Sequence, residues 1–404
     1  MLTPEYLLRI SEGAEDIAES LHIDIVNRIV ERIVIRMNRG EEYILTSQDK
    51  WQLETLQEAG YLLEEIQKEI ARRTNQQEKE IAEAFEDAGA RTLELDDKIY
   101  KAANLSPIPL FESPYMVRLM QRTYEATLGE WRNFTRTTAQ EAQQAFIKSM
   151  DNAYIQVASG SVSYSKAFTE AINGVVSDGV IVTYPSGHRD TIETAALRCV
   201  RTGVSQMSAQ ITEERMKEMD WDIVLVSSHL GARVTNAEDY TNHAWWQGKF
   251  YSRSGKDKRF PPYSVCGEGH VQGIHGANCR HSTGPGDGVH NPYEHYDSEE
   301  YRIAYETEQK QRLLERRVRN TKRETMNLKT AVDACKNEKA KFELDIDYQR
   351  KAVLLQKQNK AYADYCNENN LKTRQERVAI AKWDRKQAAA ARGAAQRYKN
   401  AKGD

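Results

Sequence analysis

The sequence predicts a mainly α-helical protein with a small irregular α+β module in the middle and long helices at both ends. Its 404 residues include only 22 Gly and 9 Pro, which argues against an all-β design. Apolar residues recur at helical spacing near the N-terminus, and residues 297–370 are highly charged and nearly free of Gly and Pro. The length allows two or three domains with a sizeable core.

The N-terminal hundred residues predict three helices. The first spans 14–38, because five apolar residues fall at i+4 spacing: Ile17, Leu21, Ile25, Ile29 and Ile33. Ser47 is a suitable N-cap for a second helix through about 73, whose apolar face would carry Leu56, Leu63, Ile66 and Ile70. A third is expected over 76–103.

The middle of the chain mixes helices with short strands. Residues 105–110 contain two prolines and predict an extended link, and Ser113-Pro114 should open another helix, with more helix near 138–158 and 163–177. Val180–Tyr184 followed by Pro-Ser-Gly predicts a hairpin with a central His- and Gly-rich region after it. A helix over 191–219 and a buried strand over 223–226 follow.

The C-terminal hundred residues should form a helical hairpin or extended helix over 297–370, with a frayed end at 387–404. Composition shifts suggest four regions: an N-terminal helical region 1–104, a second helical region 105–178, a His/Cys-rich α+β module 179–296, and a long charged tail 297–404. No apolar run approaches the ~20 residues of a membrane helix, and no signal peptide is evident.

Charge is distributed unevenly along the chain. The net charge of −3 combines 23 acidic and 12 basic residues in 1–100 with 14 acidic and 26 basic residues in 301–404. Such ends can bind different surfaces, although solvated helix faces would give the same pattern. Five scattered Cys do not form a disulfide framework, so synthesis in a reducing host cytoplasm is expected.

Seven of the nine His lie between 229 and 295, together with two of the five Cys. Zinc takes four His, Cys or carboxylate ligands, so this segment is a candidate structural zinc site. The candidate ligands are His229, His243, Cys266, His270, His275, Cys279 and His281. Hydrogen-bonded histidines with Cys279 as a small core residue are the alternative. Catalysis is a further alternative, although acids are few: Glu238, Asp239, Glu268 and Asp287.

Adjacent residues in this segment cannot all serve one site. In an extended strand side chains alternate, so at most two of Cys279, Arg280 and His281 would meet at one place without a tight turn. Arg233 would brace the module or form a bidentate pair with a carboxylate. Trp246 would supply packing area, and Gly248 a tight turn.

Three blocks in this segment resemble the phage minor capsid protein 2 family and, more loosely, the Mu F-like head-morphogenesis proteins. They are Ser227-Ser228-His229-Leu230-Gly231-Ala232-Arg233, then His243-Ala244-Trp245-Trp246-Gln247-Gly248-Lys249, then Asn278-Cys279-Arg280-His281-Ser282. The resemblance is clearest over about 190–325, where a fourth block, Gln309–Arg316, looks like the start of a long helix. About seven extra residues separate the first two blocks here, and His275 stands where relatives often have Cys.

The resemblance implies a non-enzymatic minor structural protein of a tailed-phage head. Such a protein would lie in the virion, at the portal vertex or capsid interior, with the portal protein or major capsid protein as partners. It would act in head assembly and in DNA packaging or ejection. Two alternatives are a zinc-dependent hydrolase or nuclease using the His/Cys-rich module, and a helical DNA-binding or scaffold protein that never enters the virion.

The basic tail offers candidate contacts to packaged DNA or to an acidic partner surface. Phosphate contacts by Lys and Arg are independent of sequence and sensitive to salt. The candidate residues are Arg316, Arg317, Arg319, Lys322, Arg323, Lys382, Arg385 and Lys386.

Overall fold

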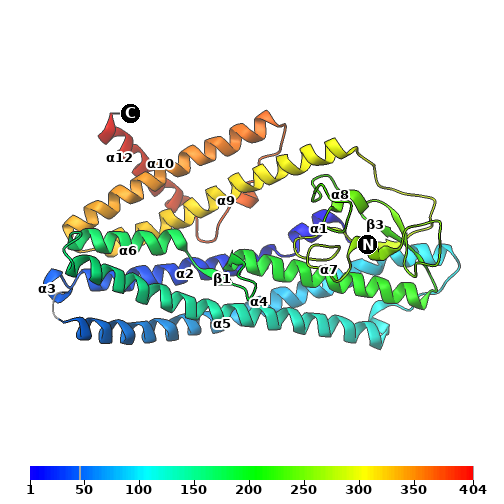
Figure 1. The fold of residues 1–404 in the computed structure, drawn as a ribbon, viewed down its shortest axis with the longest axis horizontal. Coiled ribbons are helices and arrows are strands. Elements are labelled where there is room, and N and C mark those ends of the chain that lie inside the picture. The colour runs from blue at the N-terminus through cyan, green and yellow to red at the C-terminus, as the bar shows by residue number, and fades with distance from the viewer. Residues whose placement is uncertain (45–46, 404) are drawn as a thin grey trace. The chain divides into compact units, whose positions relative to one another are not determined.

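The computed structural model describes residues 1–44 and 47–403, and its elements confirm the predicted fold class (Figure 1). Most described residues are helical, long helices lie towards both ends of the sequence, and the short antiparallel strands lie in its centre. None of the helices within the described ranges is both long and apolar enough to cross a membrane.

The elements follow one another in this order: α1 (Pro4–Arg9), α2 (Glu12–Met37), α3 (Glu41–Ile44), α4 (Gln48–Ala102), η1 (Leu110–Glu112), α5 (Pro114–Ala158), α6 (Tyr164–Asp178), β1 (Ile181–Thr183), β2 (Arg189–Thr191), α7 (Ile192–Glu218), β3 (Ile223–Val226), α8 (His243–Trp246), β4 (Phe250–Ser252), η2 (Tyr263–Cys266), β5 (Thr283–Pro285), α9 (Ser298–Ala334), α10 (Glu338–Glu368), α11 (Gln375–Val378) and α12 (Arg385–Lys402).

The chain forms two compact units, each assembled from three separate stretches. The first unit comprises Met1–Glu15, Asn75–Arg132 and Ala196–Gln309. The second comprises Asp16–Thr74, Asn133–Ala195 and Lys310–Asp404. Five of the described helices, α2, α4, α5, α7 and α9, supply residues to both units.

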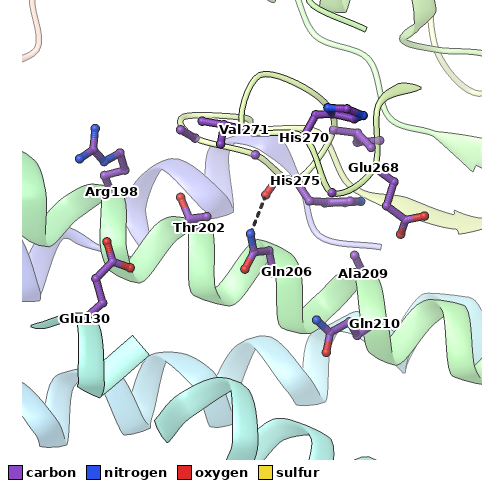
Figure 2. A pocket seen from close by; sticks show the side chains of 14 residues that line it. Glu130, Arg198, Thr202, Gln206, Ala209, Gln210, Glu268, His270, Val271 and His275 are labelled. Atoms are coloured by element: carbon purple, nitrogen blue, oxygen red, sulfur yellow. Dashed lines mark hydrogen bonds between the residues drawn. The ribbon is translucent and has the colours of Figure 1, made fainter. Parts of the chain in front are cut away.

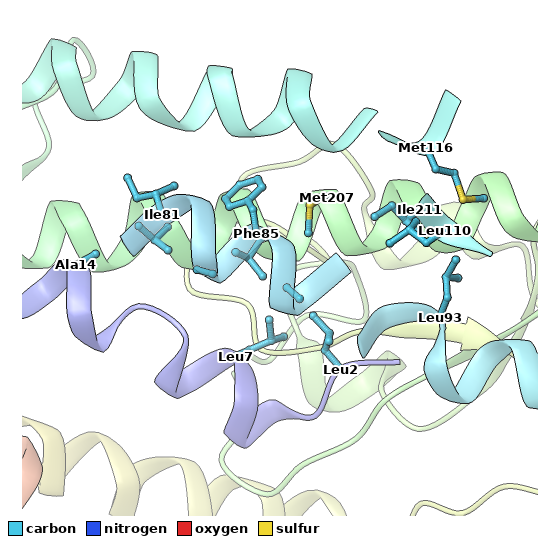
Figure 3. Close-up of a cluster of buried hydrophobic side chains, with 14 of the residues drawn as sticks. Leu2, Leu7, Ala14, Ile81, Phe85, Leu93, Leu110, Met116, Met207 and Ile211 are labelled. Atoms are coloured by element: carbon cyan, nitrogen blue, oxygen red, sulfur yellow. The ribbon is translucent and has the colours of Figure 1, made fainter. Parts of the chain in front are cut away.

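A hydrophobic cluster holds the helices of the first unit together (Figure 3). Ile81 and Phe85 of α4 pack with Met207 and Ile211 of α7, and Leu7 of α1 lies in the same cluster. A second cluster in this unit surrounds the sheet and includes Val224, Val226, Trp246, Tyr251 and Cys279. The central module is therefore built on its own apolar core.

The sheet of the module has the strand order β4-β3-β5, with both pairings antiparallel. Val224 of β3 lies opposite Tyr251 on one side and Pro285 on the other. The hydroxyl of Ser282, just before β5, donates to the carbonyl of Leu2 at 2.5 Å. Leu2 is thereby joined to a residue 280 positions away.

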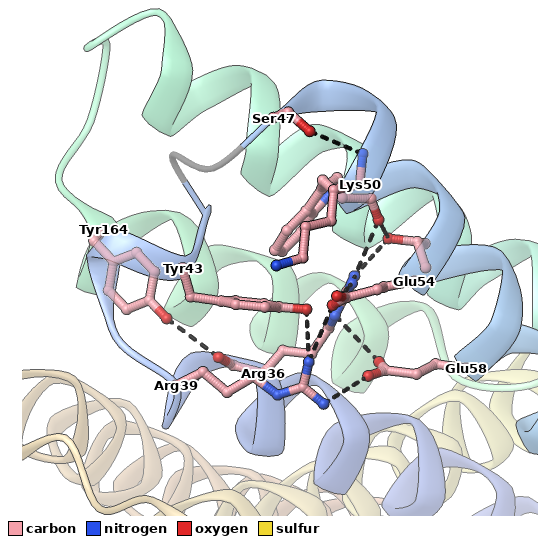
Figure 4. A network of polar contacts seen from close by, with 10 residues as sticks. Arg36, Arg39, Tyr43, Ser47, Lys50, Glu54, Glu58 and Tyr164 are labelled. Carbon is pink, nitrogen blue, oxygen red and sulfur yellow. Dashed lines mark hydrogen bonds and ion pairs between the residues drawn. The ribbon is translucent and has the colours of Figure 1, made fainter.

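A buried arginine organises the α2–α4 connection in the second unit (Figure 4). The Arg36 side chain is fully buried, and its guanidinium carbon lies 4.0 Å from the ring centroid of Trp51. Its Nε lies 3.1 Å from a carboxylate oxygen of Glu58, and Nη1 donates to Thr55 at 2.5 Å. The Arg36 charge is thus compensated by a carboxylate, a hydroxyl and an aromatic face.

Most of the expected helices and both expected strand regions are confirmed. The apolar stripe predicted for 14–38 is buried on α2, since Ile17, Leu21, Ile25, Ile29 and Ile33 are at most 7% exposed. Ser47 accepts a hydrogen bond from the backbone N–H of Lys50 at 3.2 Å, as an N-cap does. The 180–191 hairpin and the strand over 223–226 also form as predicted.

Three helix boundaries were predicted wrongly. The helices expected over 47–73 and 76–103 are one 55-residue helix, α4, because Thr74-Asn75 is too weak a signal to stop it and Thr74 bonds back to the Ile70 carbonyl. Helix α5 runs unbroken from Pro114 to Ala158. The C-terminal end is not frayed over 387–402: α12 is capped by Asp384 and packs against α10.

The apolar face predicted for the start of α4 was also only partly correct. Ile66 is buried, but Leu56 is 59% exposed, and Leu63 and Ile70 are half-buried. The buried face is instead formed by Trp51, Ala59, Leu62 and Ile66. The predicted face therefore coincides only partly with the buried face of α4.

Candidate functional site

Three of the predicted ligands meet in the core of the first unit. The nearest ligand atoms of His243, Cys279 and His281 all lie within 4.8 Å of one another. The three residues are 3%, 2% and 1% exposed, respectively. His243 begins the short helix α8, whereas Cys279 and His281 lie on the segment that leads into β5.

The backbone around β3 sets this geometry. Ser227, directly after β3, donates its N–H to the carbonyl of Ser282, and Ser282 donates its N–H to the hydroxyl of Ser227. The indole of Trp246 covers both imidazoles, with ring centroids 4.6 Å from His243 and 4.7 Å from His281. Trp246 is fully buried, as its predicted packing role requires.

Hydrogen bonds fix the protonated nitrogen of each imidazole. Nε2 of His243 lies 2.8 Å from the carbonyl oxygen of Gln272, and a carbonyl only accepts, so Nε2 carries the proton. Gln247 Oε1 accepts from the backbone N–H of His229 at 3.0 Å, which fixes the orientation of its amide. Nε2 of His281 must therefore donate to Oε1, at 2.9 Å. Both Nδ1 atoms keep a free lone pair.

The electrostatics of the site favour neutral imidazoles. Burial, together with the nearby Arg233 charge, lowers the pKa of His243 to about 4 despite its hydrogen bond to Gln272. Burial, and then the neighbouring His229 and His243, hold the pKa of His281 well below its usual value. Burial raises the pKa of the Cys279 thiol. Neutral imidazole is the metal-binding form, whereas the thiol would have to release its proton on metal binding.

The set of two imidazoles and one thiol is a ligand combination that zinc accepts. Nδ1 of His281 lies 3.5 Å from Cys279 Sγ, so the two donors already face each other. The outer nitrogens of both imidazoles are held by Gln272 and Gln247, which is the usual support for metal-binding histidines. The group could hold a metal ion.

The other four predicted ligands lie outside this group. His229 stacks on His281 with ring centroids 4.6 Å apart, but its Nδ1 bonds to the Leu230 carbonyl. Cys266 lies in the core against Tyr251. His270 stacks on Tyr240 at 4.5 Å, and His275 Nδ1 lies 3.0 Å from the Ser205 hydroxyl. The run from Cys266 to His281 thus contributes two ligands.

The side chains of Cys279, Arg280 and His281 alternate, as an extended tripeptide requires. Arg280 turns away from the group and forms a pair with Glu308, at 3.0 and 3.2 Å. Its guanidinium also donates to the carbonyl of Gly231. Only the two outer residues of the tripeptide share the candidate site.

The remaining family-motif residues are structural in their contacts. Arg233 donates to the carbonyls of Gln272 and Ala277 at 3.1 and 3.3 Å, and so braces the loop that holds His243. Gly248 adopts φ +64°, the tight turn that was expected. The others are placed as follows: Ser228 lies 3.4 Å from the Tyr301 hydroxyl, Lys249 donates to the Trp245 carbonyl, Gly231 adopts φ +77° and Asn278 adopts φ +61°.

Gln272 was not anticipated from the sequence. It contributes its backbone carbonyl, which any residue possesses, so its side-chain type carries no signal. The turns that bring it there depend on Gly267 and Gly273, where an added Cβ would lie within 2.4 Å of other atoms. A glycine-rich loop was visible in the sequence, but its closure over His243 was not.

A pocket of about 430 Å³ lies between α7 and the loop 268–277 (Figure 2). Gln206 of α7 donates to the His275 carbonyl across it at 3.5 Å. Glu130 and Arg198 line one end, and Glu268 and His270 line the loop side. This pocket is separate from the His243, Cys279 and His281 group.

Half of the predicted DNA- or partner-binding residues are used inside the second unit. Arg323 is buried and contacts both Glu19 and Glu193, and Arg319 lies 3.8 Å from Glu19. Lys322 donates to the Val378 carbonyl, and Lys382 pairs with Asp24. Arg316, Arg317, Arg385 and Lys386 are exposed, and Lys382 is exposed as well although it pairs with Asp24.

Fold and site together define a helical protein that carries a compact, internally braced His/Cys module, a design suited to a structural component. The chain matches the family model of phage minor capsid protein 2 over residues 2–389. It belongs to that family, which implies a minor structural role in the phage head, and the match indicates no enzymatic activity. No curated protein and no solved structure matches the chain.

Proposed function

We propose that the chain is a low-copy head component that binds the portal protein or the inner capsid surface and acts in head assembly. The observation that carries this proposal is the family match over nearly the whole chain. The matched range includes both the braced module and the long helices. In this proposal the module is a rigid element that the helices hold at the assembly site.

A reconstruction of the portal vertex from intact particles tests this placement. We expect density for the long helices against the portal or the inner capsid wall, and a few copies per particle in quantitative mass spectrometry of purified virions. If the chain is present in assembling heads and absent from virions, the scaffold alternative is supported instead.

The second part of the proposal is that His243, Cys279 and His281 supply three of the four ligands of a structural zinc ion. The ligand atoms of the three residues lie within 4.8 Å of one another, and a zinc ion bound by them would link α8 to the segment before β5. Elemental analysis of the purified full chain should give about one zinc per chain. A Cys279→Ala variant should lose it, whereas Cys335→Ala, which removes a buried cysteine elsewhere, should retain it.

The hydrolase alternative receives less support from the same contacts. Catalytic zinc needs a position that substrate can reach, but the three candidate ligands are at most 3% exposed. Two of the nearby acids are occupied locally, because Asp239 accepts from Thr241 and Asp287 accepts from Val289 and His290. A nuclease assay on wild type and His243→Ala is the direct test. Zinc-dependent cleavage by wild type that is lost in the variant would support the hydrolase alternative.

The third part concerns packaged DNA. Arg316, Arg317, Arg385 and Lys386 would contact phosphates without reading sequence, so binding should weaken as salt rises. Labelled duplex DNA titrated at low and moderate salt should bind wild type at low salt only. Replacing Arg316, Arg317, Arg385 and Lys386 by Ala should abolish binding, whereas the same replacement of Arg118, Arg122, Arg136 and Lys148 on α5 should not. Absence of binding at low salt would exclude a DNA role.

A further inference from the structure

A zinc ion bound by His243, Cys279 and His281 would still need one more ligand. Structural zinc sites are almost always tetrahedral and closed, which means that the protein supplies all four ligands. The three candidate ligands offer two imidazole nitrogens and one sulfur. A fourth side chain close to this group should therefore complete the site.

His229 lies directly beside the group. Its ring stacks on His281 with centroids 4.6 Å apart, which is closer than the 5.2 Å between the rings of His281 and His243. Oε1 of Gln247, which accepts from the His281 ring, also accepts from the backbone N–H of His229. A single amide oxygen thus anchors His229 at the edge of the candidate site.

The hydrogen bond of the His229 ring leaves one nitrogen that can bind a metal. Nδ1 lies 2.9 Å from the carbonyl oxygen of Leu230, and a carbonyl only accepts, so Nδ1 carries the proton. In the neutral ring Nε2 then keeps its lone pair, and within residues 1–44 and 47–403 it has no hydrogen-bond partner. His229 therefore has a free ligand atom.

All three imidazoles are supported in the same way. His243 donates to the carbonyl of Gln272, His281 to the side-chain oxygen of Gln247, and His229 to the carbonyl of its neighbour Leu230. Each ring keeps its other nitrogen for a ligand. A metal-binding histidine almost always donates its second nitrogen to an oxygen in this manner.

Two other predicted ligands near the group are occupied elsewhere. Cys266 contacts the hydroxyl of Tyr251, and the ring of His275 directs Nδ1 to the hydroxyl of Ser205. Both residues are at most 5% exposed, so neither side chain can turn without displacing the core around it. The His229 side chain is half-buried and has room to turn towards the ion.

We propose, on the basis of the zinc site proposed above, that Nε2 of His229 supplies the fourth ligand and completes a site of three imidazoles and one thiolate. Nε2 lies outside the group of ligand atoms that are within 4.8 Å of one another, so zinc binding should draw the ring inward. One proton is released, from the Cys279 thiol. With four protein ligands, the ion has no position for water or substrate.

X-ray absorption at the zinc edge of the purified full chain counts the ligands directly. We expect one sulfur at about 2.3 Å and three imidazole nitrogens at about 2.0–2.1 Å. Two imidazoles together with an oxygen or a second sulfur would overturn the assignment of His229 and leave the zinc site in place. A chain that binds no zinc would overturn both proposals.

Removal and rescue of the ring test His229 itself. His229→Gly should lower zinc affinity in chelator competition by at least about 100-fold, because a lost ligand should cost more than a lost supporting group. Free imidazole should restore part of the affinity by filling the vacated position. The control His270→Gly removes an imidazole that also stacks on an aromatic ring, that of Tyr240, and should bind zinc like wild type with or without imidazole.

A His229→Gly variant that binds zinc as tightly as wild type would overturn the proposal. If this variant fails to fold, the ligand count on wild type still decides the question, because that measurement uses the unaltered chain.

Discussion

Gln247 and His281 share a hydrogen bond of 2.9 Å from Nε2 to Oε1, and this bond decides which nitrogen faces Cys279. The backbone N–H of His229 donates to Gln247 and fixes the orientation of its amide, and this amide in turn orients the His281 imidazole. A glutamine in the second block and a histidine in the third are thereby coupled across 34 residues.

The first prediction concerns this coupling. Replacing Gln247 by Leu should lower zinc affinity about 10- to 100-fold without abolishing binding, because the imidazole loses its support but keeps its lone pair. Competition with a chromophoric chelator measures the affinity. Val289→Ala, at a 75% exposed position of the same module, should leave the affinity near wild type. An unchanged affinity in Gln247→Leu would show that the amide does not orient the ligand.

The second prediction compares two neighbouring arginines. Arg36→Ala should reduce the free energy of unfolding by about 3–5 kcal/mol, because it leaves buried polar groups and a carboxylate without their cation. Glu54 and Glu58 flank both arginines. Arg39→Ala removes a guanidinium that is 39% exposed and should cost less than about 1 kcal/mol. Urea unfolding of both variants gives the comparison, and equal losses would contradict the assignment of Arg36 as the central cation.

The third prediction separates two costs at a glycine. Gly248 and Gly269 both adopt left-handed backbone, with φ of +64° and +82°. An added Cβ at Gly248 would lie 3.0 Å from Ser228 Cβ, whereas at Gly269 it would meet nothing within 4 Å. Gly269→Ala should therefore cost only about 1–2 kcal/mol for the backbone. Gly248→Ala should cost measurably more in thermal unfolding, and the reverse order would argue against a tight approach at Ser228.

The fourth prediction concerns pH. Burial raises the pKa of Glu19 to about 7, even though Arg319 and Arg323 lie close by. The folded state then holds this proton between about pH 4.5 and 7 where the unfolded chain has released it, so stability falls as pH rises through that window. Glu19→Gln should remove this dependence. The free energy of unfolding of the variant relative to wild type should therefore be about 2 kcal/mol greater at pH 8 than at pH 5.

Unfolding midpoints of wild type and Glu19→Gln at the two pH values give that difference directly. The Gln side chain can still accept the N–H of Ala381, so the packing is preserved. A control at Glu42, an exposed glutamate of α3, should show no such difference. A gain that is equal at pH 5 and pH 8 would mean that Glu19 ionises as an ordinary surface acid.

Local periodicity predicted much of the fold. The i+4 stripe of α2 is buried as expected, and the Gly- and Pro-free stretch after 297 forms the hairpin of α9 and α10. The prediction failed on α4, where Leu56 and Ile66 were expected on one apolar face. Leu56 is 59% exposed and Ile66 is buried, because the core face runs through Trp51, Ala59, Leu62 and Ile66 instead.

The candidate site was predicted as a region and not as a set of contacts. The predicted alternation is seen in the structure: Cys279 and His281 share the candidate group, and Arg280 pairs with Glu308. Selecting His243 over His270 or His275 required the path of a loop with glycine turns, and His275 itself adopts φ +58° and turns to Ser205. Charge counts could not predict which basic residues form ion pairs inside the fold. Arg323 resembles its exposed neighbours in sequence, yet it is buried between Glu19 and Glu193.

The hydrogen bond between Leu2 and Ser282 has a consequence for how the chain is made. A ribosome adds about 5–20 residues per second, so Ser282 emerges tens of seconds after Leu2. Until then the N-terminal segment that carries Leu2 and α1 cannot form this hydrogen bond. Completion of the first unit is thus timed by synthesis of β5, and a partner that captured the early segment sooner would compete with the chain's own closure.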